Sequence, residues 1–176
     1  MCIRDRGYSP LQSGLSVTPF AIGSASAAVV AGRLVERFGR LLTVLGLSGV
    51  IVGLTATAVV LWRVPPESAG WAIAPTLLLA GIGGGFVISP NVTLTLREVP
   101  VRMAGAAGGG MQTFQRFGGA IGTAALPALF YVVLGADGGD YPEAAAASLA
   151  IAIGGSGVAL GIAVLDWRRD RRPAVS

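Results

Sequence analysis

Residues 32–40 read GRLVERFGR and stand between two long apolar segments. This stretch holds three arginines and one glutamate, whereas residues 11–31 and 41–62 carry no charged side chain. An apolar segment of about 20 residues is long enough to cross a bilayer as a helix. A short charged stretch between two such segments is typical of a tight loop that joins two membrane-spanning helices. Gly32 and Gly39 suit that loop, because glycine adopts backbone angles that other residues avoid.

The composition of the whole chain also indicates a membrane protein with the lipid bilayer as its partner. The 176 residues are 53% hydrophobic and only 12% charged, whereas a soluble domain carries about 25% charged residues. The mean hydropathy is +0.70. All 13 basic residues are arginines, and they form short clusters between apolar segments. They form no patch interleaved with aromatic residues, so we expect no nucleic-acid partner.

Five apolar segments are long enough to span a membrane, which predicts an all-α transmembrane fold without a soluble domain. They cover about residues 11–35, 41–62, 71–94, 103–134 and 144–167. The fourth is longer than one crossing requires, and tilt, a kink at Pro127 or an amphipathic start at the interface would absorb the excess. Pro90 is expected to kink the third.

Small residues recur on one face of the first two segments. Gly23, Ala27 and Ala31 follow one another at four-residue spacing in the first. Gly46, Gly49 and Gly53 share a face in the second. Small residues let membrane helices approach closely, so both faces are predicted to pack against other helices.

The arginines predict the orientation of the chain. Residues 33–40, 97–102 and the tail that follows residue 167 hold nine arginines, whereas the loops at 63–70 and 135–143 hold only Arg63. Arginine-rich loops stay in the cytoplasm. This places the N-terminus outside and the C-terminus inside, in agreement with five crossings, and predicts a multi-pass protein of the plasma (inner) membrane with residues 168–176 as a cytoplasmic tail.

Most catalytic and metal chemistry is excluded by the residue types. The chain has one cysteine, Cys2, and neither histidine nor lysine. A Cys/His metal site, a Ser-His-Asp triad and a Ser-Lys pair are therefore ruled out within it. Residues 81–85, GIGGG, lack the spacing of a dinucleotide-binding loop. Asp137, Asp140 and Glu143 lack the spacing of a calcium loop. We expect no enzyme activity, no catalytic residue, no metal and no cofactor.

Arg116 lies near the middle of the fourth segment, where a charged side chain costs at least about 2.5–3.5 kcal/mol. Gln112 lies one helical turn before it, and Gln115 directly precedes it. These three residues are candidates for the wall of a polar cavity, or Arg116 is a structural residue bonded to helix carbonyls. Asn91 is a further candidate for the cavity wall, or it caps a helix broken at Pro90.

The opening stretch resembles a known loop signature. Gly32-x-Leu34-x-Glu36-Arg37-x-Gly39-Arg40 is similar to G-x-L-x-D-R-x-G-R-[KR], which joins the second and third helices of each six-helix half in the major facilitator superfamily. The sequence departs from it at Glu36, where aspartate is usual, and at Leu41, where a second basic residue is usual. Residues 7–19, 81–91 and 108–124 also resemble helices of its fourteen-helix drug:proton antiporters.

The resemblance covers about residues 7–172 and implies the last five helices of a transporter. Residues 1–6, MCIRDR, resemble translated adapter sequence and are predicted to be a non-native start. The parent would export a small lipophilic or cationic drug-like compound in exchange for protons, by alternating access, and would need an N-terminal half outside this chain. The loop would act as a conformational latch, with Glu36, Arg37 and Arg40 as its charges and Gly32 and Gly39 as its turn formers.

One alternative stays open at this stage. The chain could be a complete five-span accessory or scaffold protein that does not transport. The loop signature and the unusual N-terminus argue against this alternative.

Overall fold

The computed structural model describes residues 10–65, 68–97, 99–136 and 141–170 and shows an all-α protein. Its long helices are α2 (Pro10–Phe38), α3 (Arg40–Arg63), α5 (Ala74–Arg97), α6 (Ala104–Ala136) and α7 (Tyr141–Asp170). The single turn α4 (Ala69–Ala72) precedes α5, and the 3₁₀ turn η1 (Val101–Met103) precedes α6. Five segments are long and apolar enough to cross a membrane. The predicted fold class, five membrane-spanning helices, is therefore confirmed. The expected non-native residues 1–6 lie outside the described residues.

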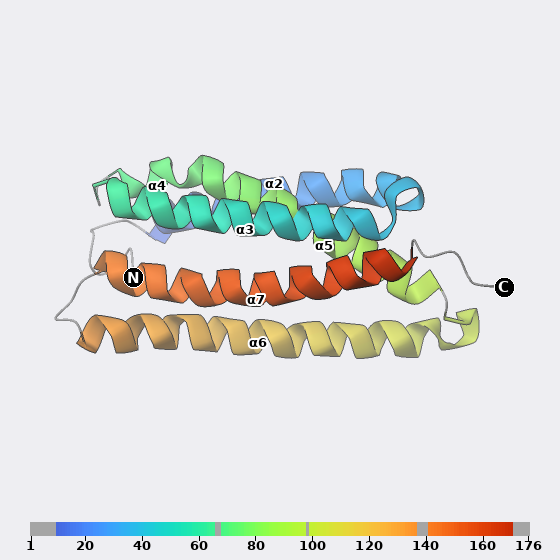
Figure 1. Ribbon diagram of the computed structural model, residues 1–176. Helices are drawn as coiled ribbons and strands as arrows, with labels where there is room; N and C mark the ends of the chain where they lie inside the picture. Colours follow the sequence, from blue (N-terminus) through green and yellow to red (C-terminus); the bar gives the residue numbers. More distant parts are fainter. Residues whose placement is uncertain (1–9, 66–67, 98, 137–140, 171–176) are drawn as a thin grey trace.

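The helices run alongside one another in an up-and-down arrangement, and the connections alternate between two ends of the bundle (Figure 1). One end, called the Gly39 end below, carries residues 38–40, the end of α5, η1 and the last residues of α7. The opposite end, called the Trp62 end, carries the end of α3, α4, the end of α6 and the start of α7. α2 and α3 both pack on α5, whereas α7 lies against α3, and α6 lies against α7 (Figure 1).

Glycines in α5 bring three helices into close contact. Gly81 and Gly85 lie directly against the backbone of α2 at Phe20 and Ser24. Gly83 points to the other neighbour, where a Cβ atom would lie only 2.6 Å from the carbonyl oxygen of Gly46 in α3. The stretch GIGGG therefore serves helix packing on two sides of α5, through contacts that any side chain would block.

The small-residue faces predicted for the first two segments make the other half of these contacts. A Cβ atom at Gly23 would lie 2.5 Å from the carbonyl oxygen of Leu78, and Ala27 and Ala31 are buried. A Cβ atom at Gly53 would lie 2.6 Å from the backbone nitrogen of Ala80. Both predicted packing faces are thus confirmed, and α5 is the helix that covers them.

The glycines of α6 behave differently. Although its sequence is as rich in small residues as that of α5, no heavy atom of the described chain lies within 4 Å of a Cβ atom built at Gly105, Gly109 or Gly119. The helix runs unbroken through Pro127 for 33 residues. Because α7 is the only long helix packed along α6, most of the α6 surface is left open.

A buried hydroxyl pair joins α3 to α5 near the Trp62 end. Thr57 is 4% exposed, and its Oγ1 lies 2.8 Å from Oγ1 of Thr76 and 2.8 Å from the carbonyl oxygen of Gly53. We expect Thr57→Val to lower the free energy of unfolding by about 1 kcal/mol, because Thr76 loses the hydroxyl that donates to it across the bundle and keeps only its own bond to the Ile73 carbonyl. Unfolding in detergent micelles measures this. Thr55→Val is the matched control, since the Thr55 hydroxyl is exposed and bonds only within its own helix; an equal loss in both variants would contradict the role of the pair.

Candidate functional site

The loop between α2 and α3 is reduced to a single residue, Gly39. This residue has φ +49° and ψ −127°, and it is the only residue with positive φ among the described ones. Its N–H donates to the carbonyl of Val35 (2.8 Å), and its carbonyl accepts from Leu42 (3.3 Å). Apart from its two chain neighbours, no described residue comes within 4 Å of a Cβ atom built at Gly39. Glycine is therefore required here by the backbone angles and not by lack of space.

Gly39→Ala is accordingly expected to destabilise the turn by about 1–2 kcal/mol, which is the cost of a left-handed conformation for a residue with a Cβ atom. The matched control is Gly14→Ala, because Gly14 has equally open surroundings and no positive φ. Thermal unfolding of both variants in detergent micelles measures the difference. Equal melting temperatures would show that the Gly39 backbone imposes no strain on alanine.

Arg40, the first residue of α3, is tied to the end of α7. Its Nη1 forms an ion pair with Oδ2 of Asp166, and its Nε lies 3.6 Å from Oδ2 of Asp170. Carboxylates near the C-terminus of a helix interact unfavourably with the helix dipole. The ion pairs with Arg40 offset this unfavourable interaction for Asp166 and Asp170. The three side chains are 37%, 50% and 64% exposed. An exposed pair of this kind contributes only about 0–1 kcal/mol, which makes it easy to open.

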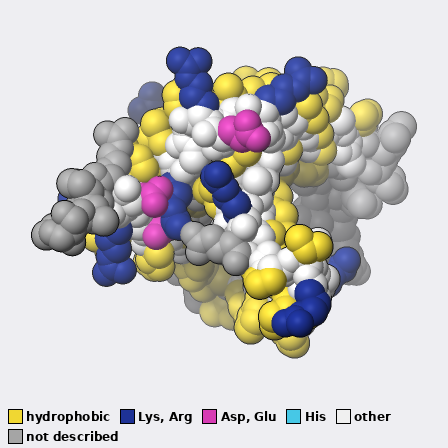
Figure 2. Space-filling view, turned by 90° about the vertical axis from the view of Figure 1, so that its right-hand side faces the viewer, with side chains coloured by type: hydrophobic (Ala, Val, Ile, Leu, Met, Phe, Trp, Pro, Cys, Tyr) yellow, Lys and Arg dark blue, Asp and Glu magenta, His cyan; other side chains and the backbone are white. Residues whose placement is uncertain are grey.

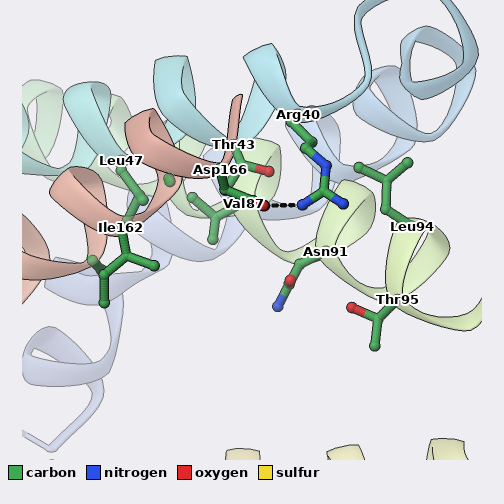
Figure 3. A pocket seen from close by; sticks show the side chains of 11 residues that line it. Arg40, Thr43, Leu47, Val87, Asn91, Leu94, Thr95, Ile162 and Asp166 are labelled. Carbon is green, nitrogen blue, oxygen red and sulfur yellow. Dashed lines mark hydrogen bonds and ion pairs between the residues drawn. The ribbon is translucent and has the colours of Figure 1, made fainter. Parts of the chain in front are cut away.

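The ion pair borders a cavity of about 430 Å³ between α3, α5 and α7. Thr43, Asn91 and Thr95 supply polar side chains to its wall, and the rest of the lining is mostly aliphatic. Figure 3 shows Arg40 and Asp166 joined to each other, with the Asn91 amide pointing away from them. No α6 residue belongs to this lining. The structure therefore groups Asn91 with the Gly39 end and separates it from Gln112, Gln115 and Arg116.

The remaining residues of the loop signature lie on the last turns of α2. Glu36 and Arg97 line a second hollow, between α2 and α5, and the described residues offer Glu36 no ion pair and no helix cap. Arg37 lies 5.6 Å from the ring centre of the adjacent Phe38. Gly32 packs near the Ser89 hydroxyl of α5, at 3.4 Å from a built Cβ atom, and Leu34 is half-buried.

Charged side chains gather over the Gly39 end, where arginines surround a few acidic side chains (Figure 2). Sequence reasoning missed that two of these acids, Asp166 and Asp170, meet Arg40. Their signal was present, since DWRRD places two carboxylates one helical turn apart inside an otherwise basic segment. Within the described ranges, no three His, Cys, Asp or Glu side chains come together as a metal site.

α6 carries the other group of predicted site residues. Gln112, Gln115 and Arg116 are exposed, and they form no hydrogen bond or ion pair with a described residue. Helical geometry places Gly105, Gly109, Gln112, Arg116 and Thr123 on one stripe. This polar stripe lies about 100° around the helix from the side that packs on α7.

A third side of α6 is apolar. Phe114, Phe117, Ile121 and Val132 are 64–80% exposed and lie more than a quarter turn away from the polar stripe. The helix thus presents three different surfaces: one to α7, one suited to lipid or an apolar partner, and one with amide and guanidinium donors. Exposure of amide and guanidinium groups to hydrocarbon costs free energy, so the polar stripe is expected to face a water-filled cavity.

Comparison with known proteins matches residues 1–123 to the family described as the Major Facilitator Superfamily. A probable actinorhodin transporter of Streptomyces coelicolor is 29% identical over 134 residues, which are 73% of this chain and 22% of that protein. A tetracenomycin C resistance and export protein of Streptomyces glaucescens is 32% identical over 127 residues, covering 70% of this chain and 22% of that protein. The multidrug resistance protein Stp of Mycobacterium tuberculosis is 32% identical over 123 residues, covering 69% of this chain and 22% of that protein. No solved structure matches.

Proposed function

This chain belongs to the major facilitator superfamily, and on that premise we propose that it forms part of a drug exporter that works by alternating access. The relatives are named as transport, export or resistance proteins, and the chain spans 22% of the length of the first two. Export is therefore a property of the larger protein, in which this five-helix bundle and an N-terminal half enclose a shared substrate site. We also propose that the larger protein exports its substrate in exchange for protons.

The observation that carries the proposal is the tie between the Gly39 turn and α7. Arg40 connects a turn with a demanding backbone geometry to the end of a helix that is distant in sequence. Because the pair is exposed and weak, it can form in one arrangement of the helices and break in another. Gly32, Leu34, Glu36, Arg37, Gly39 and Arg40 then make up a conformational latch.

In this proposal the Gly39 end faces the cytoplasm of the plasma membrane. Residues 33–40, residues 97–102 and the end of α7 meet at that end and hold most of the arginines. The Trp62 end carries Arg63 alone among the described arginines and presents two highly exposed tryptophans, Trp62 and Trp71. Arginine-rich loops favour the cytoplasm, and exposed tryptophans are typical of a membrane interface.

The polar stripe of α6 forms part of the wall of the substrate cavity. Gln112 and Arg116 supply its donors near the middle of the membrane, and Gln115 lies beside them at the edge that faces α7. The apolar side of the same helix faces lipid or a neighbouring helix. The cavity next to Arg40, which holds Asn91, lies at the Gly39 end and belongs to the latch.

Dye efflux from bacterial cells tests the function. Cells that express the full-length transporter containing this chain are loaded with ethidium, a cation, or in a parallel sample with fluorescein, an anion, and are then re-energised and followed by fluorescence. We expect active efflux that stops when an ionophore collapses the proton gradient. Cells that express the same transporter with Arg40→Asp serve as the matched control and should retain the dye. Efflux no faster than in cells without the transporter would contradict the proposal, and efflux that survives the ionophore would contradict proton exchange.

A further inference from the structure

Arg116 has an unusual position among the charged residues of the described spans. It lies fifteen residues after Val101 and nineteen before Gly135, the two ends of its span. Every other charged residue of the five spans lies within five residues of a span end. At 1.5 Å per residue, Arg116 is about 22 Å from the nearer end of a span about 52 Å long. With about 30 Å of hydrocarbon centred on that span, Arg116 lies about 12 Å inside the hydrocarbon, farther than its side chain can reach toward the interface.

Nothing in the described chain neutralises this charge. Asp166, Asp170, Glu36 and Glu143 all lie near span ends, and the ion pairs of the described residues do not include Arg116. Its guanidinium also forms no hydrogen bond with a helix carbonyl among the described residues, in contrast to the threonines next to it. Thr113 and Thr123 use their hydroxyls on the carbonyls of Gly109 and Gly119. The donors that remain for a ligand are those of Arg116, Gln112 and Gln115.

The surroundings of Arg116 also leave room for a ligand. The Ser148 hydroxyl donates to the Leu126 carbonyl (3.2 Å), which fixes how the antiparallel α6 and α7 are aligned. Arg116 lies ten residues before Leu126 in α6, and Val158 lies ten residues after Ser148 in α7, so the two residues are at the same height in the bundle. At this level α7 carries Gly154, Gly155, Gly157 and Gly161, and no atom of the other described helices lies within 4 Å of a Cβ atom built at any of them.

We propose that Arg116, with Gln112 one helical turn before it, binds the negatively charged oxygen of an organic anion, a carboxylate or a phenolate, at the centre of the membrane. This inference rests on the proposed export function and specifies its substrate class. It replaces the lipophilic or cationic compound expected from the resemblance by an anionic one. A guanidinium pairs with carboxylate oxygens in a two-point geometry, and amide N–H groups add further donors. A substrate cation would instead meet an uncompensated positive charge from this helix.

Two dyes that share a xanthene ring system and differ in charge test the inference. Fluorescein is an anion with a carboxylate and a phenolate, whereas rhodamine 123 is a cation. Binding to the purified full-length transporter in lipid nanodiscs is measured by fluorescence anisotropy. We expect fluorescein to bind more tightly than rhodamine 123. Arg116→Gln should weaken fluorescein binding by about tenfold to a hundredfold, which is the usual effect of losing a charge-assisted hydrogen bond, and should not weaken rhodamine binding.

Two further variants keep the test decisive. Arg116→Lys retains the positive charge and should preserve part of the fluorescein affinity, including in the event that Arg116→Gln does not fold. Arg102→Gln removes an exposed arginine at the Gly39 end and should change neither affinity. Tighter binding of rhodamine 123 by the wild-type protein, or an equal loss of both dyes in Arg116→Gln, would overturn the anion site while leaving export intact. Failure of both dyes to bind, together with an absence of efflux of both ethidium and fluorescein, would overturn the export function itself.

Discussion

Gly83→Ala is expected to lower the free energy of unfolding by about 1–3 kcal/mol, the usual cost of forcing atoms into a filled contact. A Cβ atom at this position would lie 2.5 Å from the backbone nitrogen of Val50 and 2.6 Å from the carbonyl oxygen of Gly46. Both neighbours are backbone atoms, so no side chain can rotate away. The helices α3 and α5 would have to separate, and the contacts along their whole length would loosen.

The neighbouring residue supplies the matched control. A Cβ atom at Gly84 would approach only Cζ of the Phe20 side chain, at 3.8 Å, which is ordinary van der Waals contact. Because alanine favours a helix over glycine by about 1 kcal/mol, Gly84→Ala should be neutral or stabilising. Unfolding of both variants by titration of mixed micelles with sodium dodecyl sulfate measures the difference. Equal stability of the two would contradict the close packing of α5 on α3.

Reversal of either charge in the Arg40–Asp166 pair is expected to impair export by the full-length transporter. Arg40→Asp and Asp166→Arg each replace an attraction by a repulsion between α3 and α7. A bias of about 1 kcal/mol already changes the ratio of two conformations about fivefold, so the transporter would spend too little time in one of them. The double variant restores an attraction with its direction reversed and should recover most of the export rate.

The initial rate of dye efflux in energised cells, measured with whichever of ethidium and fluorescein the wild-type transporter exports and normalised to the amount of transporter in the membrane, measures this effect. Arg169→Asp is the matched control, because it also reverses a charge near the end of α7 and no ion pair in the described part of the chain includes Arg169. It should export at nearly the wild-type rate. A double variant no better than the single ones would show that the two charges act separately.

The apolar segments and the arginine clusters predicted the five helices and the position of the loop, because segment length and charge are properties of the sequence alone. Partners were harder to predict. The glycines of α5 and α6 look alike in sequence, yet those of α5 contact two helices and those of α6 contact none that is described. Small residues permit close approach, and only the arrangement of the other helices decides whether it occurs.

The residues of the candidate site also fall into those that the sequence predicted and those that only the packing revealed. The signature at residues 32–40 identified Gly39 and Arg40, since a turn this tight requires glycine and its charges stand out in an apolar chain. Its partner Asp166 lies 126 residues from Arg40 in an arginine-rich segment, where the excess of positive charge concealed the two acids. Asn91 was grouped with Arg116 because both are polar residues inside apolar segments, whereas the packing of α5 between α2 and α3 places Asn91 next to Arg40.

We propose that the Arg40–Asp166 pair closes the side of this bundle that faces the cytoplasm. Thr95 lines the cavity next to that pair, so a single cysteine at this position reports on its opening. The test uses Thr95→Cys in a full-length transporter without other cysteines, including Cys2, and a membrane-impermeant thiol reagent applied to each side of oriented vesicles. The account predicts labelling from the cytoplasmic side only, faster with Arg40→Asp, and slowed again when Asp166→Arg is added. Labelling from the outer side, or a rate that ignores both charges, would contradict it.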